Sequence, residues 1–381
     1  MTDAERLIKA RSCFPHIQEG KVYLNHAATG PFSSPVKQAL NKYLKDRATD
    51  NIENYLDLMG VIEETLQWIG EMINAPAQNI EFAPNTSYGL NVLAQGLSWN
   101  PGDRIIIPAC EFPANVYPFL QLRSQGVEID FVPHTEGTFG VGDIEALMTD
   151  RTRLLTLSWV QFLSGFRVDL ESIADLCKKR NVLLSVDAIQ GLGALEIDVQ
   201  QAGIDFLASG GHKWLLSAQG IGFVYVSDSL LQKLDPMLGW LNGPVDWRNL
   251  TDYDMAPYPD ARKFRLGTLN GLGITALHAS LKLYREMDPT WCERNLLKIT
   301  KYARQRLESL GLTVYGSSDE SHLAGISSFV HPESDALFSE LNKNRIYTAL
   351  RDDKLRFSPG YYAAFEDIDR AASVISSYLG G

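Results

Sequence analysis

The sequence has few cysteines and no pattern that would place them in a disulfide framework or a metal site. Its 381 residues include four widely separated cysteines and no C-x-x-C pair: Cys13, Cys110, Cys177 and Cys292. The seven histidines form neither an H-x-x-x-H nor an H-E-x-x-H pattern. We therefore expect no metal centre, no disulfides and a reducing, cytoplasmic compartment.

Long apolar runs and basic blocks are also missing. No stretch approaches the roughly 20 apolar residues that a membrane-spanning helix requires. The opening segment, MTDAERLIKARSCF, is charged and has no apolar core of a secretory signal. The net charge is −11, without a lysine and arginine block, so neither nucleic acid nor an anionic membrane is expected as a partner. No G-x-S-x-G motif occurs, which removes the commonest hydrolase signature.

Three apolar runs in the middle of the chain predict strands that are buried on both faces: Val182–Val186, Phe206–Ala208 and Ile221–Val226. The first run ends in Asp187, and the second leads to Lys213. Polar residues just past such strands face the ligand crevice of an α/β sheet. An acid and a lysine at one crevice suit pyridoxal phosphate, because the lysine can bind it as a Schiff base while the acid pairs with the ring nitrogen. Taken singly, Asp187 would be a helix cap and Lys213 a solvated side chain.

Asp187-Ala188-Ile189-Gln190 followed by His212-Lys213 resembles the Asp-x-x-Gln … His-Lys signature of the class V aminotransferases. That group includes cysteine desulfurases, kynureninases and isopenicillin N epimerase-like proteins. The resemblance implies pyridoxal 5′-phosphate as cofactor, with Lys213 and Asp187 catalytic and Gln190 and His212 beside the cofactor. It also implies an α/β, aspartate-aminotransferase-like fold (fold type I). We expect a large, mostly parallel-sheet domain over 21–270 and a small α+β domain over 271–381, with residues 1–20 as an arm of the small domain.

Further segments match the cofactor site of the family. Thr86-Ser87 opens an apolar-periodic run, and a helix N-terminus attracts anions, so the resemblance assigns these hydroxyls to the phosphate. A plain N-cap is the alternative. Phe112 stands where the family has a ring-stacking histidine; it can stack but cannot transfer a proton, and it could also be a core residue. The resemblance assigns Gln161 to the cofactor's 3′-oxygen. Gly210 departs from the family, which has a phosphate-binding serine there.

The remaining matches concern the substrate and the assembly. The loop with Asn25 and His26 resembles a family loop near the substrate, although a plain loop is equally consistent with its residues. Arg356 matches the arginine that binds the substrate α-carboxylate, a role suited to its bidentate fork. Arg265-Leu266-Gly267-Thr268-Leu269-Asn270 resembles an element whose threonine, here Thr268, reaches the phosphate in the neighbouring subunit. The resemblance therefore implies a homodimer with a shared active site.

We predict a pyridoxal-phosphate enzyme that acts on an α-amino acid, a small-molecule substrate, with transamination as the expected reaction. Epimerisation, as in isopenicillin N epimerase-like proteins, and side-chain lysis require the same cofactor and the same cofactor-binding and substrate-binding residues, so both remain open. A non-catalytic cofactor-binding module is a further alternative. The presence of both Lys213 and Arg356 argues against it, because a scaffold would not need both. Ordinary cysteine desulfuration is not expected. It requires a cysteine on a flexible loop ahead of the carboxylate-binding arginine, and no cysteine lies between His331 and Arg356.

Overall fold

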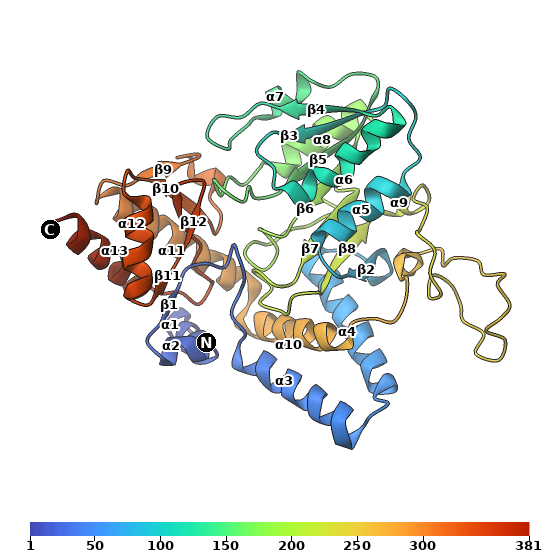
Figure 1. The fold of residues 1–381 in the computed structure, drawn as a ribbon, viewed down its shortest axis with the longest axis horizontal. Coiled ribbons are helices and arrows are strands. Elements are labelled where there is room, and N and C mark those ends of the chain that lie inside the picture. Colours follow the sequence, from blue (N-terminus) through green and yellow to red (C-terminus); the bar gives the residue numbers. More distant parts are fainter. Residues whose placement is uncertain (381) are drawn as a thin grey trace.

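A seven-stranded sheet forms the centre of the protein in the computed structural model, which describes residues 1–380 (Figure 1). The strand order is β2-β8-β7-β6-β5-β3-β4, and β8 alone runs antiparallel to its neighbours. The strands are β2 (Ile80–Ala83), β3 (Arg104–Pro108), β4 (Glu128–Val132), β5 (Thr152–Ser158), β6 (Leu183–Asp187), β7 (Phe206–Gly210) and β8 (Gly222–Val226). The predicted, mostly parallel sheet is therefore present.

Helices cover both faces of this sheet. They are α3 (Ser34–Lys45), α4 (Tyr55–Ile73), α5 (Thr86–Gly96), α6 (Tyr117–Leu120), α7 (Val141–Glu145), α8 (Leu170–Arg180), α9 (Asp228–Leu231) and α10 (Gly271–Met287). Alternate residues of β3 contact different apolar clusters: Ile105 and Ile107 pack with α5 and α6, whereas Ile106 packs with α4, α8 and α10. Strands buried on both faces must be apolar at every position, which is the pattern that the sequence carries.

The smaller domain is a four-stranded antiparallel sheet with helices on it. Its strand order is β12-β13-β10-β9. Its elements are α11 (Pro289–Glu308), β9 (Thr313–Tyr315), β10 (Ser327–Val330), α12 (Ser334–Lys343), β12 (Ala349–Arg351), β13 (Lys354–Phe357) and α13 (Phe365–Leu379). In Figure 1 this domain, in orange and red, lies to the left of the large sheet.

Two sets of contacts cross the domain boundary that the sequence predicts. Strand β1 (Val22–Tyr23) pairs in parallel with β11 (Ile346–Tyr347), and Val22 and Leu24 join the apolar cluster of the small domain. Helix α10, assigned to the small domain, packs its Ile274 and Leu277 into the cluster under the large sheet. Composition cannot reveal either contact, because each partner lies far away in the sequence.

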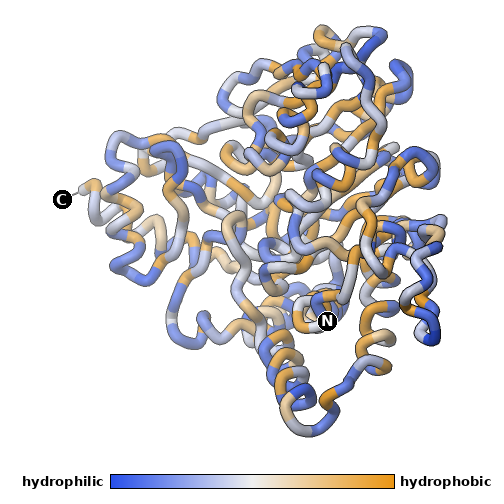
Figure 2. The backbone as a smooth tube through the Cα atoms, turned by 45° about the vertical axis from the view of Figure 1, so that its right-hand side comes forward, coloured by the Kyte–Doolittle hydropathy of each residue, from blue (hydrophilic) through white to orange (hydrophobic). Residues whose placement is uncertain are grey.

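The outer parts of the chain are simpler. The arm consists of α1 (Asp3–Ser12) and α2 (Pro15–Gln18). Ala10 of α1 and Phe14, the residue before α2, pack against residues of α10 and α11. Residues 242–259 form a long loop, which extends from the body in Figure 1. The protruding helices α3 and α4 alternate apolar and polar residues along their length in Figure 2, as amphipathic helices do. No helix within residues 1–380 is long and apolar enough to cross a membrane.

Candidate active site

A cavity of about 350 Å³ lies where the carboxyl ends of β6 and β7 face the small domain. Eight of the predicted site residues line it: Thr86, Ser87, Phe112, Asp187, Gln190, His212, Lys213 and Arg356. The other lining residues are Ala27, Ala28, Asn85, Ala114, Phe162, Ile189 and Arg351. Parallel strands bring their carboxyl ends to one edge, so residues from distant parts of the sequence meet here.

Lys213 and Asp187 form the polar floor of the cavity. Asp187 is 2% exposed, and one of its carboxylate oxygens accepts a hydrogen bond from the Ile189 amide at 3.0 Å. Burial raises the pKa of Asp187, and the nearby Glu111 raises it further. Burial lowers the pKa of Lys213, although Asp187 opposes that shift. A lysine of lowered pKa keeps part of its amine unprotonated, and this is the form that attacks a carbonyl.

The loop after β1 holds the backbone around Lys213 in place. The Gly30 amide donates a hydrogen bond to the His212 carbonyl at 2.8 Å, and the Thr29 hydroxyl donates to the same oxygen at 3.2 Å. A Cβ on Gly30 would lie 2.3 Å from the Lys213 carbonyl oxygen, so a larger residue cannot fit at this position. The glycine in the predicted loop therefore permits a close backbone approach.

Gln190 ties the same loop to the strand ends. Its amide nitrogen donates to the Ala27 carbonyl at 3.1 Å, and its amide oxygen accepts from the Trp214 indole at 2.9 Å. Gln190 thus links the segment after β6, the loop after β1 and the residue next to Lys213. This network fixes the walls of the cavity on the large-domain side.

The N-terminus of α5 also lies at the cavity, which Asn85, Thr86 and Ser87 line. Asn85 caps α5 by accepting the Tyr88 amide at 2.8 Å, and the buried Thr86 Oγ1 has no hydrogen-bond partner within residues 1–380. A Cβ on Gly89 would lie 2.6 Å from Val224 Cγ1, so α5 packs directly on β8 with its N-terminus at the cavity. A free hydroxyl beside free helix amides suits a phosphate.

His212 completes this end of the cavity. A Cβ on Gly210 would lie 3.2 Å from His212 Nδ1, so the missing side chain at Gly210 leaves room for the imidazole ring. Burial lowers the pKa of His212 and the charge of Lys213 lowers it further, which favours the neutral ring. A neutral imidazole can still donate one hydrogen bond to an anion.

Glu111, which the sequence analysis did not single out, lies buried behind Asp187. Its carboxylate accepts hydrogen bonds from the Ser158 amide at 2.7 Å, the Ser158 hydroxyl at 2.5 Å and the Gln161 amide at 2.7 Å. The buried amide oxygen of Gln161 has no partner within residues 1–380, and Phe162, rather than Gln161, is among the residues that line the cavity. The signal available in the sequence is an acid in the segment after β3, next to Phe112.

Three other predicted site residues also do not line the cavity. Asn25 and His26 precede the lining residues Ala27 and Ala28. His26 is buried, with Nδ1 at 3.0 Å from the Ser358 carbonyl and Nε2 at 2.9 Å from the Tyr362 hydroxyl. Both ring nitrogens of His26 are therefore in hydrogen bonds, and burial lowers its pKa to about 3, so the ring is neutral and packs in the interior.

The exposed Thr268 lines a separate cavity of about 260 Å³ with Tyr88.

Arg356 brings a buried positive charge from the small domain. It lies on β13, between β10 and β12, and is 2% exposed. Its Nη1 donates to the Phe162 carbonyl at 2.7 Å, and no described residue bonds its Nε. Burial lowers its pKa to about 10, with the neighbouring Arg351 as a further cause. A buried guanidinium with a free edge suits a carboxylate ligand. Arg351, also missed in the sequence, lines the same wall.

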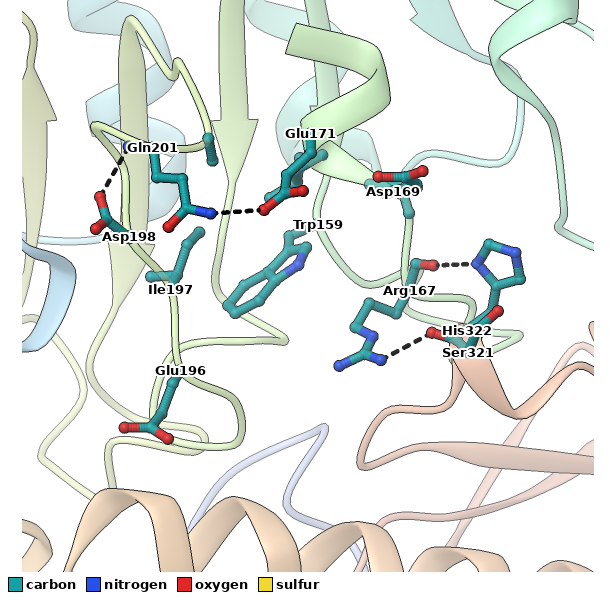
Figure 3. A pocket seen from close by; sticks show the side chains of 13 residues that line it. Trp159, Arg167, Asp169, Glu171, Glu196, Ile197, Asp198, Gln201, Ser321 and His322 are labelled. Carbon is teal, nitrogen blue, oxygen red and sulfur yellow. Dashed lines mark hydrogen bonds between the residues drawn. The ribbon is translucent and has the colours of Figure 1, made fainter. Parts of the chain in front are cut away.

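A larger cavity of about 490 Å³ lies elsewhere, lined by Trp159, Arg167 and neighbouring residues (Figure 3). Its polar side chains bond to one another: Gln201 donates to Glu171 at 3.1 Å, and Arg167 donates to the Ser321 carbonyl at 2.8 Å. Its lining contains no lysine. This cavity is larger than the one that Lys213 lines, so volume does not identify the candidate active site, whereas the chemistry of the lining does.

Comparison with known proteins gives consistent matches. The family model described as Aminotransferase class-V matches residues 22–370. A probable cysteine desulfurase of Methanothermobacter thermautotrophicus is 32% identical over 81% of this chain and 77% of its own. The apo structure of a cysteine desulfurase from Thermococcus onnurineus NA1 has a TM-score of 0.88 at 23% identity over 97% of each chain. A C-DES mutant with glycine covalently linked to its pyridoxal-phosphate cofactor has a TM-score of 0.88 at 22% identity, over 96% of this chain and 98% of its own. These structures confirm the predicted fold.

Proposed function

The chain belongs to the class-V aminotransferase family of pyridoxal-phosphate enzymes, and on that basis we propose that it transaminates an α-amino acid, with Lys213 as the cofactor-binding lysine. The observation that carries the proposal is one cavity lined by Lys213, Asp187 and Arg356. A lysine, a ring-nitrogen partner and a carboxylate anchor are the groups that amino-acid chemistry on this cofactor requires.

The cavity fits the cofactor at both ends. Thr86 Oγ1 is buried without a partner beside the N-terminus of α5, which supports phosphate binding by Thr86, Ser87 and His212. Asp187 reaches the cavity with one oxygen bonded to a backbone amide, which supports pairing of the other oxygen with the ring nitrogen. The Phe112 ring centroid lies 5.8 Å from the Lys213 amine, close enough to cover one face of the ring.

Within this arrangement, the protein's own groups bind, orient and move a proton. The bound cofactor supplies an electron sink for the negative charge that develops at the substrate α-carbon. Lys213 Nζ, with its lowered pKa, accepts the α-proton and returns a proton as general acid. Arg356 fixes the α-carboxylate, and so orients the α-hydrogen toward Lys213. Asp187, as a carboxylate, stabilises positive charge at the ring nitrogen.

Cysteine desulfuration is not supported, although several relatives are named as cysteine desulfurases. The residues ahead of Arg356 form the β12–β13 hairpin, whose two turn residues, Asp352 and Asp353, have φ of 46° and 60°. This tight turn leaves no flexible loop, and it carries no cysteine. Cys110 does not line the cavity, and burial raises its pKa to about 12, which disfavours the thiolate that a sulfur acceptor needs.

We further propose a homodimer in which Thr268 serves the site of the partner subunit. Two observations support it. Thr268 is exposed and lines a cavity apart from that of Lys213. The long loop over 242–259 exposes Trp247, Leu250 and Tyr253, an apolar surface that a second subunit would cover. The four unpaired cysteines support a cytoplasmic location.

An amino-acid panel tests the reaction. Holoenzyme is incubated with each amino acid and a 2-oxo acid acceptor, and products are identified by mass. Transamination yields the matching 2-oxo acid and the new amino acid in equal amounts. Free ammonia with a shortened product would indicate lysis, and loss of optical purity without deamination would indicate epimerisation; either result contradicts the proposal. Sulfide and alanine from L-cysteine, lost in Cys110→Ser, would make the protein a desulfurase.

A further inference from the structure

Two arginines of the β12–β13 hairpin line the candidate active site together. The register pairs Ala349 with Arg356 and Arg351 with Lys354. Because side chains alternate along a strand, Arg351, Lys354 and Arg356 project from the same face of the hairpin. Lys354 is directed elsewhere: its amine lies 4.6 Å from the Tyr315 ring centroid and donates to the Asp352 carbonyl at 2.8 Å. Arg351 and Arg356 line the cavity.

The charges of the two arginines have no counter-ion in the described chain. Arg351 donates to the Leu350 carbonyl at 2.8 Å, and Arg356 donates to the Phe162 carbonyl, so both partners are neutral oxygens. The buried Arg356 Nε has no partner at all. Asp187 is the one acid in the cavity lining, and it comes from the end of β6 in the other domain. Adjacent like charges without a counter-ion are unfavourable, so this wall is suited to a ligand with more than one negative group.

The position of Arg351 is defined by the fold. It is the last residue of β12 and is followed directly by the two-residue turn, whose left-handed backbone holds the hairpin closed. Burial lowers the pKa of both Arg356 and Lys213, and the charge of Arg351 lowers both further, so Arg351 lies close enough to act on these two groups. Arg351 is exposed and makes no other side-chain bond, which leaves its guanidinium free to meet a ligand at the mouth of the cavity.

We propose that the substrate carries two carboxylates, with the α-carboxylate bound by Arg356 and the side-chain carboxylate bound by Arg351. The substrate class is then an acidic amino acid and the matching 2-oxo dicarboxylate. This inference rests on the proposed function, because it assigns the second substrate group at the same site. It makes Arg351 a specificity residue that selects the side chain and takes no part in the proton transfer.

The test compares unreactive carboxylates on the holoenzyme, with binding followed by the absorption of the cofactor. Glutarate and valerate share a five-carbon chain and differ by one carboxylate. The wild type should bind glutarate at least about tenfold more tightly than valerate, the effect of one charge-assisted bidentate pair. Arg351→Gln should abolish this preference and leave valerate affinity unchanged. Lys354→Gln, on the same face but outside the cavity, should bind both acids as the wild type does.

Two results would overturn the inference: a wild type with equal affinity for the two acids, or an Arg351→Gln protein that loses affinity for both acids equally. These outcomes are separable from failure of the proposed function. An enzyme that transaminates only monocarboxylic amino acids contradicts the inference and leaves the proposed function intact. An enzyme that prefers glutarate through Arg351, yet only racemises or cleaves acidic amino acids, contradicts the proposed reaction and supports the dicarboxylate site.

Discussion

Replacing one hydroxyl at Thr86 should change the stability of the cofactor-free protein and its cofactor affinity in opposite directions. Thr86 is 4% exposed, and its Oγ1 has no hydrogen-bond partner within the described residues. An unsatisfied buried hydroxyl costs about 1–3 kcal/mol, so the isosteric Thr86→Val should stabilise the cofactor-free protein by about 1 kcal/mol. The variant also loses one hydrogen bond to a charged phosphate, worth about 1.5–3 kcal/mol, which corresponds to a cofactor affinity roughly 10–100-fold weaker.

Denaturant unfolding of the cofactor-free protein and equilibrium titration with pyridoxal phosphate measure the two effects. Thr300→Val is a matched control, because Thr300 is fully buried in α11 and donates to the Leu296 carbonyl at 2.9 Å. That variant should lose about 1 kcal/mol of stability and keep its cofactor affinity. If Thr86→Val destabilises the protein as Thr300→Val does and binds cofactor normally, Thr86 is not part of a phosphate site.

Three further predictions follow from the same contacts. Arg356→Ala should raise the substrate KM about 30-fold and leave the cofactor spectrum unchanged, since a charge-assisted pair contributes about 2 kcal/mol; an unchanged KM for every substrate argues against carboxylate binding by Arg356. Thr268→Ala should weaken cofactor retention in the dimer, and a fully active monomer would rule out a shared site. Burial lowers the pKa of His26 from 6.5 to about 3, so its contribution to stability is complete above pH 6.5 and falls as the pH drops toward 3. This loss is about 1.4 kcal/mol per pH unit, and His26→Gln should flatten the pH dependence of the unfolding free energy; an identical slope would contradict the neutral, buried ring.

The residues at the ends of buried strands could be predicted from the sequence. A strand that is apolar at every position must be covered on both faces, so the first polar residue after it marks the edge of the sheet. Asp187 and Lys213 follow this rule, and the structure brings both into one cavity. Thr86 is similar, because the start of an apolar-periodic run locates a helix N-terminus.

Positions within loops could not be predicted in the same way. Which residue of a loop faces the cavity depends on tertiary contacts, so Ala27 lines it whereas His26 bonds Ser358 and Tyr362. Gln161, which the resemblance assigns to the cofactor, bonds the buried Glu111, a contact that the sequence does not record.

Arg351 and β1 gain their roles from strand pairing, which no local pattern records.

Reduction with borohydride, followed by peptide mapping, tests the central claim most directly. The holoenzyme should carry one cofactor-sized mass on the peptide that contains Lys213, and Lys213→Ala should carry none. Lys263 is the internal comparison, because it is also buried but donates to the carbonyls of Leu231 and Leu234 at 2.6 Å. Label on Lys263 or on any other lysine, or a reconstituted protein that binds no cofactor, would contradict the account.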